Sequence, residues 1–253
     1  MAVVRDVPSE QSAALSDRVR PGSLAHERVL PILPELAPLV PGGGLRRGSV
    51  IVTSGVAATS LALALAAGPT AGGAWLGVVG MPSLGIVAAA ELGVAVERLF
   101  LVAAPPANQW AEIVAAVVDG AEIVMAVPPI GVRGSDARRV QARVSSRGAV
   151  LVLAGAEPVP GFQPDLQVRA RAAAWEGIEQ GAGRLLARRV TIEVSGRRAA
   201  RPVTRELLLP GPLGGIAVPP PAAIDPAAPA TAIPASAGVG EPSAVAGELR
   251  ETG

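Results

Sequence analysis

The chain has 253 residues, half of them hydrophobic, and a formal net charge of only +1 from 22 basic and 21 acidic residues. It contains no cysteine and a single histidine, His26, which excludes disulfides, thiolate chemistry, cysteine-type zinc sites and metal sites built from several histidines. Every basic residue is an arginine, so the chain offers no lysine to hold a phosphate.

The first 41 residues are predicted to form a short helix and a connector. Residues 9–20 have an amphipathic helical pattern, and no apolar signal segment precedes them, so we expect a cytoplasmic protein, with nucleoid association as a further option. Four prolines then predict an extended connector: Pro31, Pro34, Pro38 and Pro41.

Apolar runs alternate with helical segments from residue 49 to residue 154. Strands are predicted at residues 49–53, 74–79, 99–103, 121–127 and 149–154. Helices are predicted at residues 57–67, 83–92, 108–118 and 135–146, with Ser83, Ser135 and either Ala107 or Asn108 as N-caps. This alternation predicts an α/β fold, with a parallel sheet covered by helices on both faces. The apolar stretch 49–67 therefore reads as a buried strand and helix and not as a membrane span.

The pattern changes after residue 165. Alternation with period two predicts strands at residues 166–174, 187–195 and 203–209, which together form an antiparallel β-meander. From residue 214 onward proline, alanine, glycine and serine dominate, and such a segment cannot bury enough apolar surface to offset its chain entropy. We expect a disordered C-terminal tail over residues 214–253. This tail carries a charge of −3, so the preceding residues carry +4.

The turn after the first apolar strand is the first candidate site. Gly55, Thr59 and Ser60 could offer backbone N–H groups and hydroxyls to a phosphate at a helix N-terminus. However, Gly48 and Gly55 do not fit the G-x-x-x-x-G-K-[ST] spacing of a P-loop, and the lysine is absent. An ordinary strand-to-helix turn is the other interpretation.

The strand ends lack the acids that an ATPase needs. The second strand of the series runs into Gly80 and Met81, and the fourth runs into Pro128, where a P-loop enzyme places groups that hold Mg²⁺ or orient water. We therefore expect no catalytic residue, no cofactor and no metal site. The remaining acids of this region read as solvated: Glu91, Glu97, Glu112, Asp119 and Glu122.

Arginine gathers on the fourth helix and on the meander. These residues form a candidate surface for a partner protein or DNA: Arg138, Arg139, Arg143, Arg188, Arg189, Arg197 and Arg198. The modest charge and the few stacking aromatics favour a protein partner, with weak DNA contact as the alternative.

The order of motifs over roughly residues 36–212 resembles the core of the RecA recombinase family. RecA-type proteins carry a GGL-x-x-G step before the P-loop strand and LGV before a later apolar strand. This chain reads GGGLRRG at residues 42–48 and ELGV at residues 91–94. The segment RVTIEVSGRRAARPVTRELLLPG at residues 189–211 is similar to the closing RecA hairpin. The resemblance implies a RecA-like domain over residues 42–213.

Three differences from RecA indicate which branch of the RecA-like proteins this chain resembles. The phosphate loop is short and lacks lysine, the metal-associated and catalytic acids are replaced, and the segment between Gly155 and Leu166 is short where a recombinase carries a DNA-binding loop. This combination resembles ImuA, called ImuA-prime in actinobacteria, an accessory of SOS-induced translesion synthesis. The resemblance implies a non-catalytic protein that works with an ImuB-type polymerase-like protein and an error-prone C-family polymerase. An ATP-binding regulator with arginine in place of lysine and a single-stranded-DNA-binding RecA-family regulator are the alternatives.

Overall fold

A computed structural model describes residues 29–155, 159–179, 182–197, 199 and 201–220. Contacts divide the chain into two units, Met1–Pro219 and Pro220–Gly253, and the fold described below belongs to the first. The helix predicted at residues 9–20 and residues 221–253 of the predicted tail lie outside the described residues. Residues 214–220 of that tail are described, and Ala217 exchanges two backbone hydrogen bonds with Leu208.

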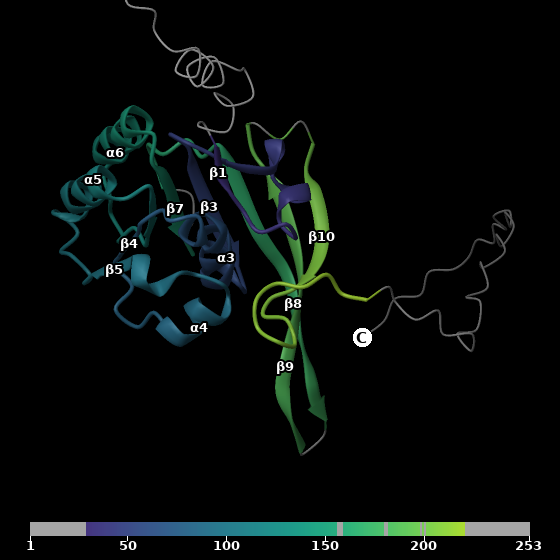
Figure 1. Cartoon of the computed structure of the whole chain (residues 1–253). Coiled ribbons are helices and arrows are strands. Elements are labelled where there is room, and N and C mark those ends of the chain that lie inside the picture. The colour runs from purple at the N-terminus through teal and green to yellow at the C-terminus, as the bar shows by residue number, and fades with distance from the viewer. Residues whose placement is uncertain (1–28, 156–158, 180–181, 198, 200, 221–253) are drawn as a thin grey trace, which may run out of the picture. The chain divides into compact units, whose positions relative to one another are not determined.

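An eight-stranded mixed sheet forms the core of this unit (Figure 1). Its strands are β3 (Val50–Gly55), β4 (Leu76–Val79), β5 (Leu99–Val102), β6 (Ile123–Ala126), β7 (Val150–Ala154), β8 (Leu166–Glu179), β9 (Ala182–Ser195) and β10 (Val203–Leu208). They lie in the order β10-β9-β8-β3-β7-β6-β4-β5. The strands from β8 to β5 are parallel, whereas β9 is antiparallel to both of its neighbours. The predicted α/β class, with a mostly parallel sheet and antiparallel closing strands, is confirmed.

Helices cover both faces of the parallel strands. On one face lie α3 (Ala58–Ala71) and α4 (Ile86–Glu91), whose buried residues join one apolar cluster. On the other face lie α5 (Trp110–Gly120) and α6 (Gly134–Arg147), which bury one apolar stripe each in a second cluster. The stripes follow from helical periodicity, since apolar residues three and four apart share one side of a helix.

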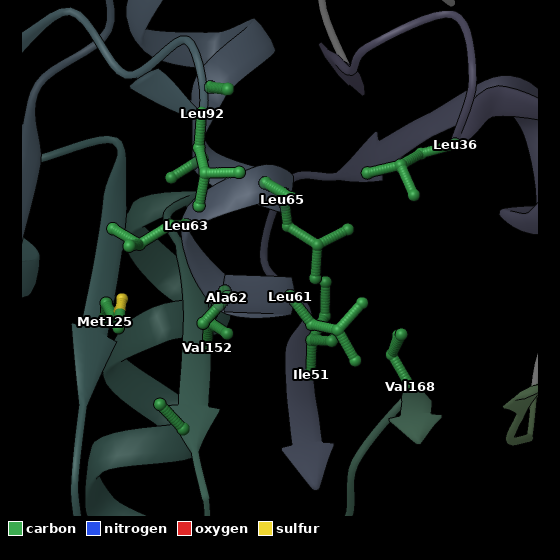
Figure 2. Packing of buried hydrophobic residues seen from close by; sticks show 14 of the residues in the cluster. Leu36, Ile51, Leu61, Ala62, Leu63, Leu65, Leu92, Met125, Val152 and Val168 are labelled. Atoms are coloured by element: carbon green, nitrogen blue, oxygen red, sulfur yellow. The ribbon is translucent and has the colours of Figure 1, made fainter. Parts of the chain in front are cut away.

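Helix α3 is apolar on all sides because it is covered on all sides. Leu61 and Leu65, four residues apart, share one side of the helix, Leu63 lies on another side, and all three are buried. Figure 2 shows these side chains between sheet residues such as Ile51 and outer residues such as Leu36. A helix without a polar face is expected inside a layered core. None of the described helices combines the length and the apolar character that a membrane crossing requires.

The proline-rich connector is not extended as predicted. Its first residues form β1 (Val29–Pro31), which pairs antiparallel with β2 (Gly44–Arg46), and between them lie two 3-10 turns, Ala37–Leu39 and Pro41–Gly43. The turns bury three apolar side chains in the α3 cluster: Leu36, Leu39 and Val40. Burial of these residues therefore outweighs the extended preference of the prolines.

The helix starts also differ from the predicted caps. Helix α4 begins after Gly85 and not at Ser83, and α5 begins after Gln109 and not after Ala107 or Asn108. Helix α6 begins after Arg133, which places Ser135 inside its first turn. The side chains of these three N-caps make no capping hydrogen bond to the backbone of the helix. The predictions relied on the cap preference of serine and asparagine, which does not decide these starts.

Candidate functional site

The turn between β3 and α3 lies at the carboxyl end of the first parallel strand, where α/β proteins bind ligands. It contains only Val56 and Ala57, and Ala57 makes no side-chain cap hydrogen bond. Gly55 has φ +85° and pairs with Ala170 of β8, so close that an added Cβ would lie 2.1 Å from the Ala170 carbonyl oxygen. Gly55 thus serves the close approach of two strands, and the turn has little backbone with which to surround a phosphate.

Arg188 of β9 reaches the first turn of α3. Its Nη2 donates a hydrogen bond of 2.8 Å to the Ser60 hydroxyl, and its Nε donates one of 2.8 Å to the Leu209 carbonyl oxygen. The guanidinium also lies 5.3 Å from the centre of the Trp175 ring. Burial lowers the pKa of the Arg188 guanidinium. The structure therefore brings together Ser60 and Arg188, two predicted site residues that are 128 positions apart in the chain.

A pocket of about 360 Å³ opens beside this turn. Thr59 and Ser60 of α3 line it, together with Met81 after β4 and Val127 after β6. Met81 and Val127 stand near the strand ends where a P-loop ATPase carries its acids. Among the described residues that line the pocket none is charged, so their side chains offer hydroxyls and apolar groups only.

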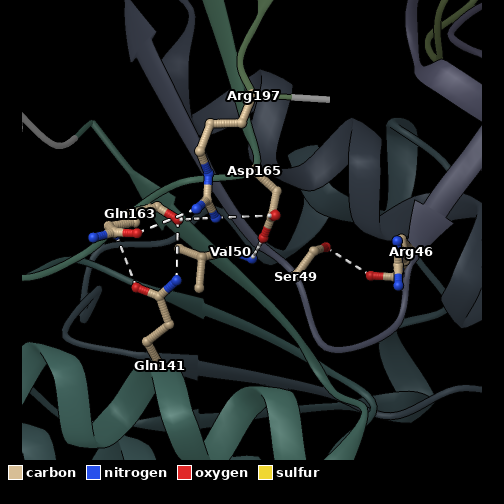
Figure 3. Close-up of polar contacts among 7 residues, drawn as sticks. All are labelled: Arg46, Ser49, Val50, Gln141, Gln163, Asp165 and Arg197. Carbon is tan, nitrogen blue, oxygen red and sulfur yellow. Dashed lines mark hydrogen bonds and ion pairs between the residues drawn. The ribbon is translucent and has the colours of Figure 1, made fainter. Parts of the chain in front are cut away.

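A second polar cluster lies at the opposite, amino ends of β3 and β8 (Figure 3). The buried carboxylate of Asp165 accepts a hydrogen bond of 3.1 Å from the Val50 N–H and forms an ion pair of 3.3 Å with Arg197. Arg197 also donates to Gln163, whose backbone exchanges two hydrogen bonds with the Gln141 side chain. These contacts join β3, the start of β8 and α6, so Arg197 helps to stabilise the packing of these elements.

The arginines of α6 make separate contacts. Arg143 binds both carboxylate oxygens of Asp119 at 2.6 Å, and Arg147 binds the same carboxylate at 2.9 Å. These hydrogen bonds lower the pKa of Asp119 to about 2. Arg139 lies 3.7 Å from Asp136, and Arg138 is exposed.

The predicted arginine surface is spread over several places. Arg189 lies next to Arg188 but on the opposite face of β9, and it pairs with Glu176 at 2.9 Å and Glu206 at 3.5 Å. Arg198 lies outside the described residues. The arginines of α6, Arg197 and the Arg188 site thus occupy different parts of the fold, and four of the six described candidates have a carboxylate partner.

None of the acids that the sequence assigns to solvent lines the pocket. Glu122 accepts a hydrogen bond of 2.8 Å from the Trp75 N–H before β4, and Asp119 is held by α6. The part of the chain that the structure describes contains no group of three His, Cys, Asp or Glu side chains that could hold a metal ion.

Two residues of these clusters were not predicted as site residues from the sequence. Asp165 directly precedes the alternating run of β8, and an acid at such a position is a signal for an interaction with a neighbouring strand. Trp175 carries no signal of its own, because its contact with Arg188 depends on the register of β8 and β9.

Comparison with known proteins gives a similarity over part of the chain. A family model described as the MT3502 N-terminal domain matches residues 38–161. The chain is also 35% identical over 122 residues to the uncharacterized protein Rv3395c of Mycobacterium tuberculosis (strain ATCC 25618 / H37Rv). That alignment covers 46% of this chain and 56% of the mycobacterial protein, so the chain spans little more than half the length of this relative.

Proposed function

We propose that this chain is a RecA-like accessory protein of the ImuA-prime type, which supports SOS-induced translesion DNA synthesis by binding polymerase components and does not hydrolyse ATP. The observation that most supports this proposal is the structure of the β3–α3 turn. Gly55 is pressed against Ala170, and the Ser60 hydroxyl already accepts a hydrogen bond from Arg188. A turn of this kind keeps the fold of a nucleotide site but leaves little room for a triphosphate.

The sheet topology supports the RecA-like part of this proposal. Strand β3 lies inside the sheet between β7 and β8, which is the place of the P-loop strand in a RecA-like core. The antiparallel pair β9–β10 closes the sheet, in keeping with the closing hairpin that the resemblance implies.

The pocket chemistry supports the non-catalytic part. Phosphoryl transfer relies on a metal ion and on charged groups positioned around the phosphate. The pocket beside α3 is lined instead by residues such as Met81, Leu84 and Val127. A scaffold that retains its fold without these groups acts through its surfaces.

The place in translesion synthesis comes from the family resemblance. The similarity to a mycobacterial protein is compatible with it, and the ImuB-type and C-family polymerase partners are those that the resemblance implies. The family match ends at residue 161, before β8 begins, so the closing strands lie beyond the matched residues.

An ATP-binding regulator is the second candidate, because Arg188 places a cation at the first turn of α3. That guanidinium is already held by Ser60 and the Leu209 carbonyl oxygen, so an incoming phosphate would have to displace these contacts. We expect calorimetric titration with Mg–ATP to give a dissociation constant weaker than about 1 mM. Micromolar binding would favour the ATP-binding regulator instead.

A genetic experiment tests the proposed function. Deletion of the gene is expected to reduce damage-induced mutation frequency to the spontaneous level, and expression of the full chain is expected to restore it. Unchanged induced mutagenesis in the deletion strain would contradict the proposal.

A further inference from the structure

The far halves of β8 and β9 form an arm that extends beyond the rest of the sheet (Figure 1). Strand β3 pairs with β8 only as far as Ala170, and β10 pairs with β9 only as far as Arg189. The arm comprises residues 172–179 of β8 and residues 182–188 of β9, which pair with each other. A two-stranded ribbon with open edges is marginally stable in water and offers unpaired backbone groups to another strand.

The arm exposes large apolar side chains. Trp175 is 44% exposed, Leu185 is 53% exposed and Leu186 is 43% exposed. Val56 is exposed as well, in the turn that follows Gly55 at the base of the arm. Such a concentration on a narrow ribbon is typical of a surface that another protein covers.

Arg188 adds to this apolar surface a positive charge whose contacts are all with neutral groups. Its hydrogen-bond acceptors, the Ser60 hydroxyl and the Leu209 carbonyl oxygen, are both neutral. Its neighbour Arg189 pairs with Glu176, whereas no carboxylate of the described residues forms an ion pair with Arg188. A partly desolvated cation with neutral partners gains from an anion brought beside it.

We propose that the arm binds an extended, acidic and apolar segment of a partner protein, which adds as a strand to the free edge of β8 and places a carboxylate beside Arg188. Strand addition supplies main-chain hydrogen bonds, and alternate side chains of the added strand would face Trp175. This inference rests on the proposed protein-binding function and assigns it a surface.

The composition of the arm favours a protein over nucleic acid as the partner. Proteins that bind single strands combine a basic groove with several stacking aromatics. Among the described arm residues the one exposed aromatic side chain is Trp175, and the other large exposed side chains are the aliphatic Leu185 and Leu186. On the face opposite Arg188, Glu176 of the arm pairs with Arg189, which directly follows the arm.

Photo-crosslinking in damage-treated cells tests the proposal. The full chain carries a benzophenone amino acid either at Leu186 or, as a matched control, at Trp75. Trp75 is 41% exposed and also lies beside an arginine, Arg98, at 5.5 Å, but at the start of β4. We expect crosslinks from position 186, and not from position 75, to a segment of another protein that alternates apolar and acidic residues.

A peptide copy of the crosslinked segment then tests the contacts. Arg188→Gln, Trp175→Ala and replacement of the peptide's acids by amides should each weaken binding at least roughly tenfold, and Trp75→Ala should leave it unchanged. The amide peptide is tested with the unchanged protein, so it shows whether binding requires the acids even if Arg188→Gln disturbs the fold.

The arm proposal would be overturned if position 186 crosslinks to nucleic acid, to a second copy of the chain or to residues 221–253 of the same chain. It would also be overturned if position 186 gives no more crosslinks than position 75, or if the peptide binds equally well with its acids replaced by amides. If these occur while polymerase components still copurify with the chain, the proposed function stands and the arm is not its surface. If the arm captures an acidic segment of a protein unrelated to polymerases, the arm proposal stands and the role in translesion synthesis fails.

Discussion

Asp119 is a single residue that joins two helices: it lies in the last turn of α5 and contacts arginines near the end of α6. An acid near a helix C-terminus is unfavourable on its own, because it meets the negative end of the helix dipole. Here Arg143 and Arg147 surround its carboxylate and hold the pKa of Asp119 at about 2. The charged carboxylate is therefore the form that stabilises the contact between the two helices.

Asp119→Asn is expected to lower the melting temperature at pH 7 by a few degrees at most, since exposed ion pairs contribute little. A carboxyl whose pKa is depressed on folding contributes stability above its ordinary pKa, and this stability is lost as the pH falls through its folded value. The difference between wild type and Asp119→Asn should thus shrink below about pH 4, be small at pH 2 and vanish only below that pH. Thermal unfolding at pH 7, 4 and 2 measures it.

The control for this prediction is a double-mutant cycle. In a chain that already carries Arg143→Gln and Arg147→Gln, Asp119→Asn should have almost no effect at any pH. An equal loss of stability at pH 7 and pH 2 would show that the ion pairs do not cause it.

Among the secondary-structure elements, helix α3 packs in close backbone contact with the segment at Pro31 and Ile32. A Cβ at Gly68 would lie 2.7 Å from Ile32 Cα and 2.8 Å from the Pro31 carbonyl oxygen. The glycine therefore lets residues 29–40 pack directly on the helix. This contact covers the outer side of α3 and explains how an apolar stretch of this length is buried without a membrane.

Gly68→Ala is expected to destabilise the protein by about 1–3 kcal/mol, because the N-terminal segment must move away from α3. Gly120→Ala is the matched control at the end of α5, where an added Cβ meets no atom within 4 Å. It should be neutral or stabilising by up to about 1 kcal/mol. Urea unfolding of both variants measures the two changes, and equal effects would refute the packing argument.

Sequence patterns predicted the strands well and their ends less well. The apolar runs that became β3, β6 and β7 are buried on both faces, so hydrophobicity alone locates them. The arm was missed because an alanine run and Gly177 interrupt the alternation, and the register of β8 and β9 shifts at those places. Strand β1 was missed because Pro31 favours a connector and a three-residue strand has too short a pattern.

The candidate site depended on topology that the sequence does not contain. Gly55, Thr59 and Ser60 could be proposed from the strand–turn–helix pattern alone. The hydrogen bond between Ser60 and Arg188 could not, because it requires β8 and β9 to lie beside β3. Likewise the sequence gives no sign that the exposed Arg197 forms an ion pair with the buried Asp165.

At the scale of the whole described fold, an α/β core carries a short β3–α3 turn, held by contacts of Gly55 with Ala170 and of Ser60 with Arg188, beside a pocket lined by uncharged residues. In the proposed account the core supports binding surfaces, among them the arm of β8 and β9, and the function lies in what those surfaces hold. Affinity purification of the full chain from cells after DNA damage tests this most directly. The account predicts that a polymerase-like ImuB-type protein and a C-family polymerase copurify with it. Recovery of no polymerase component would contradict the account.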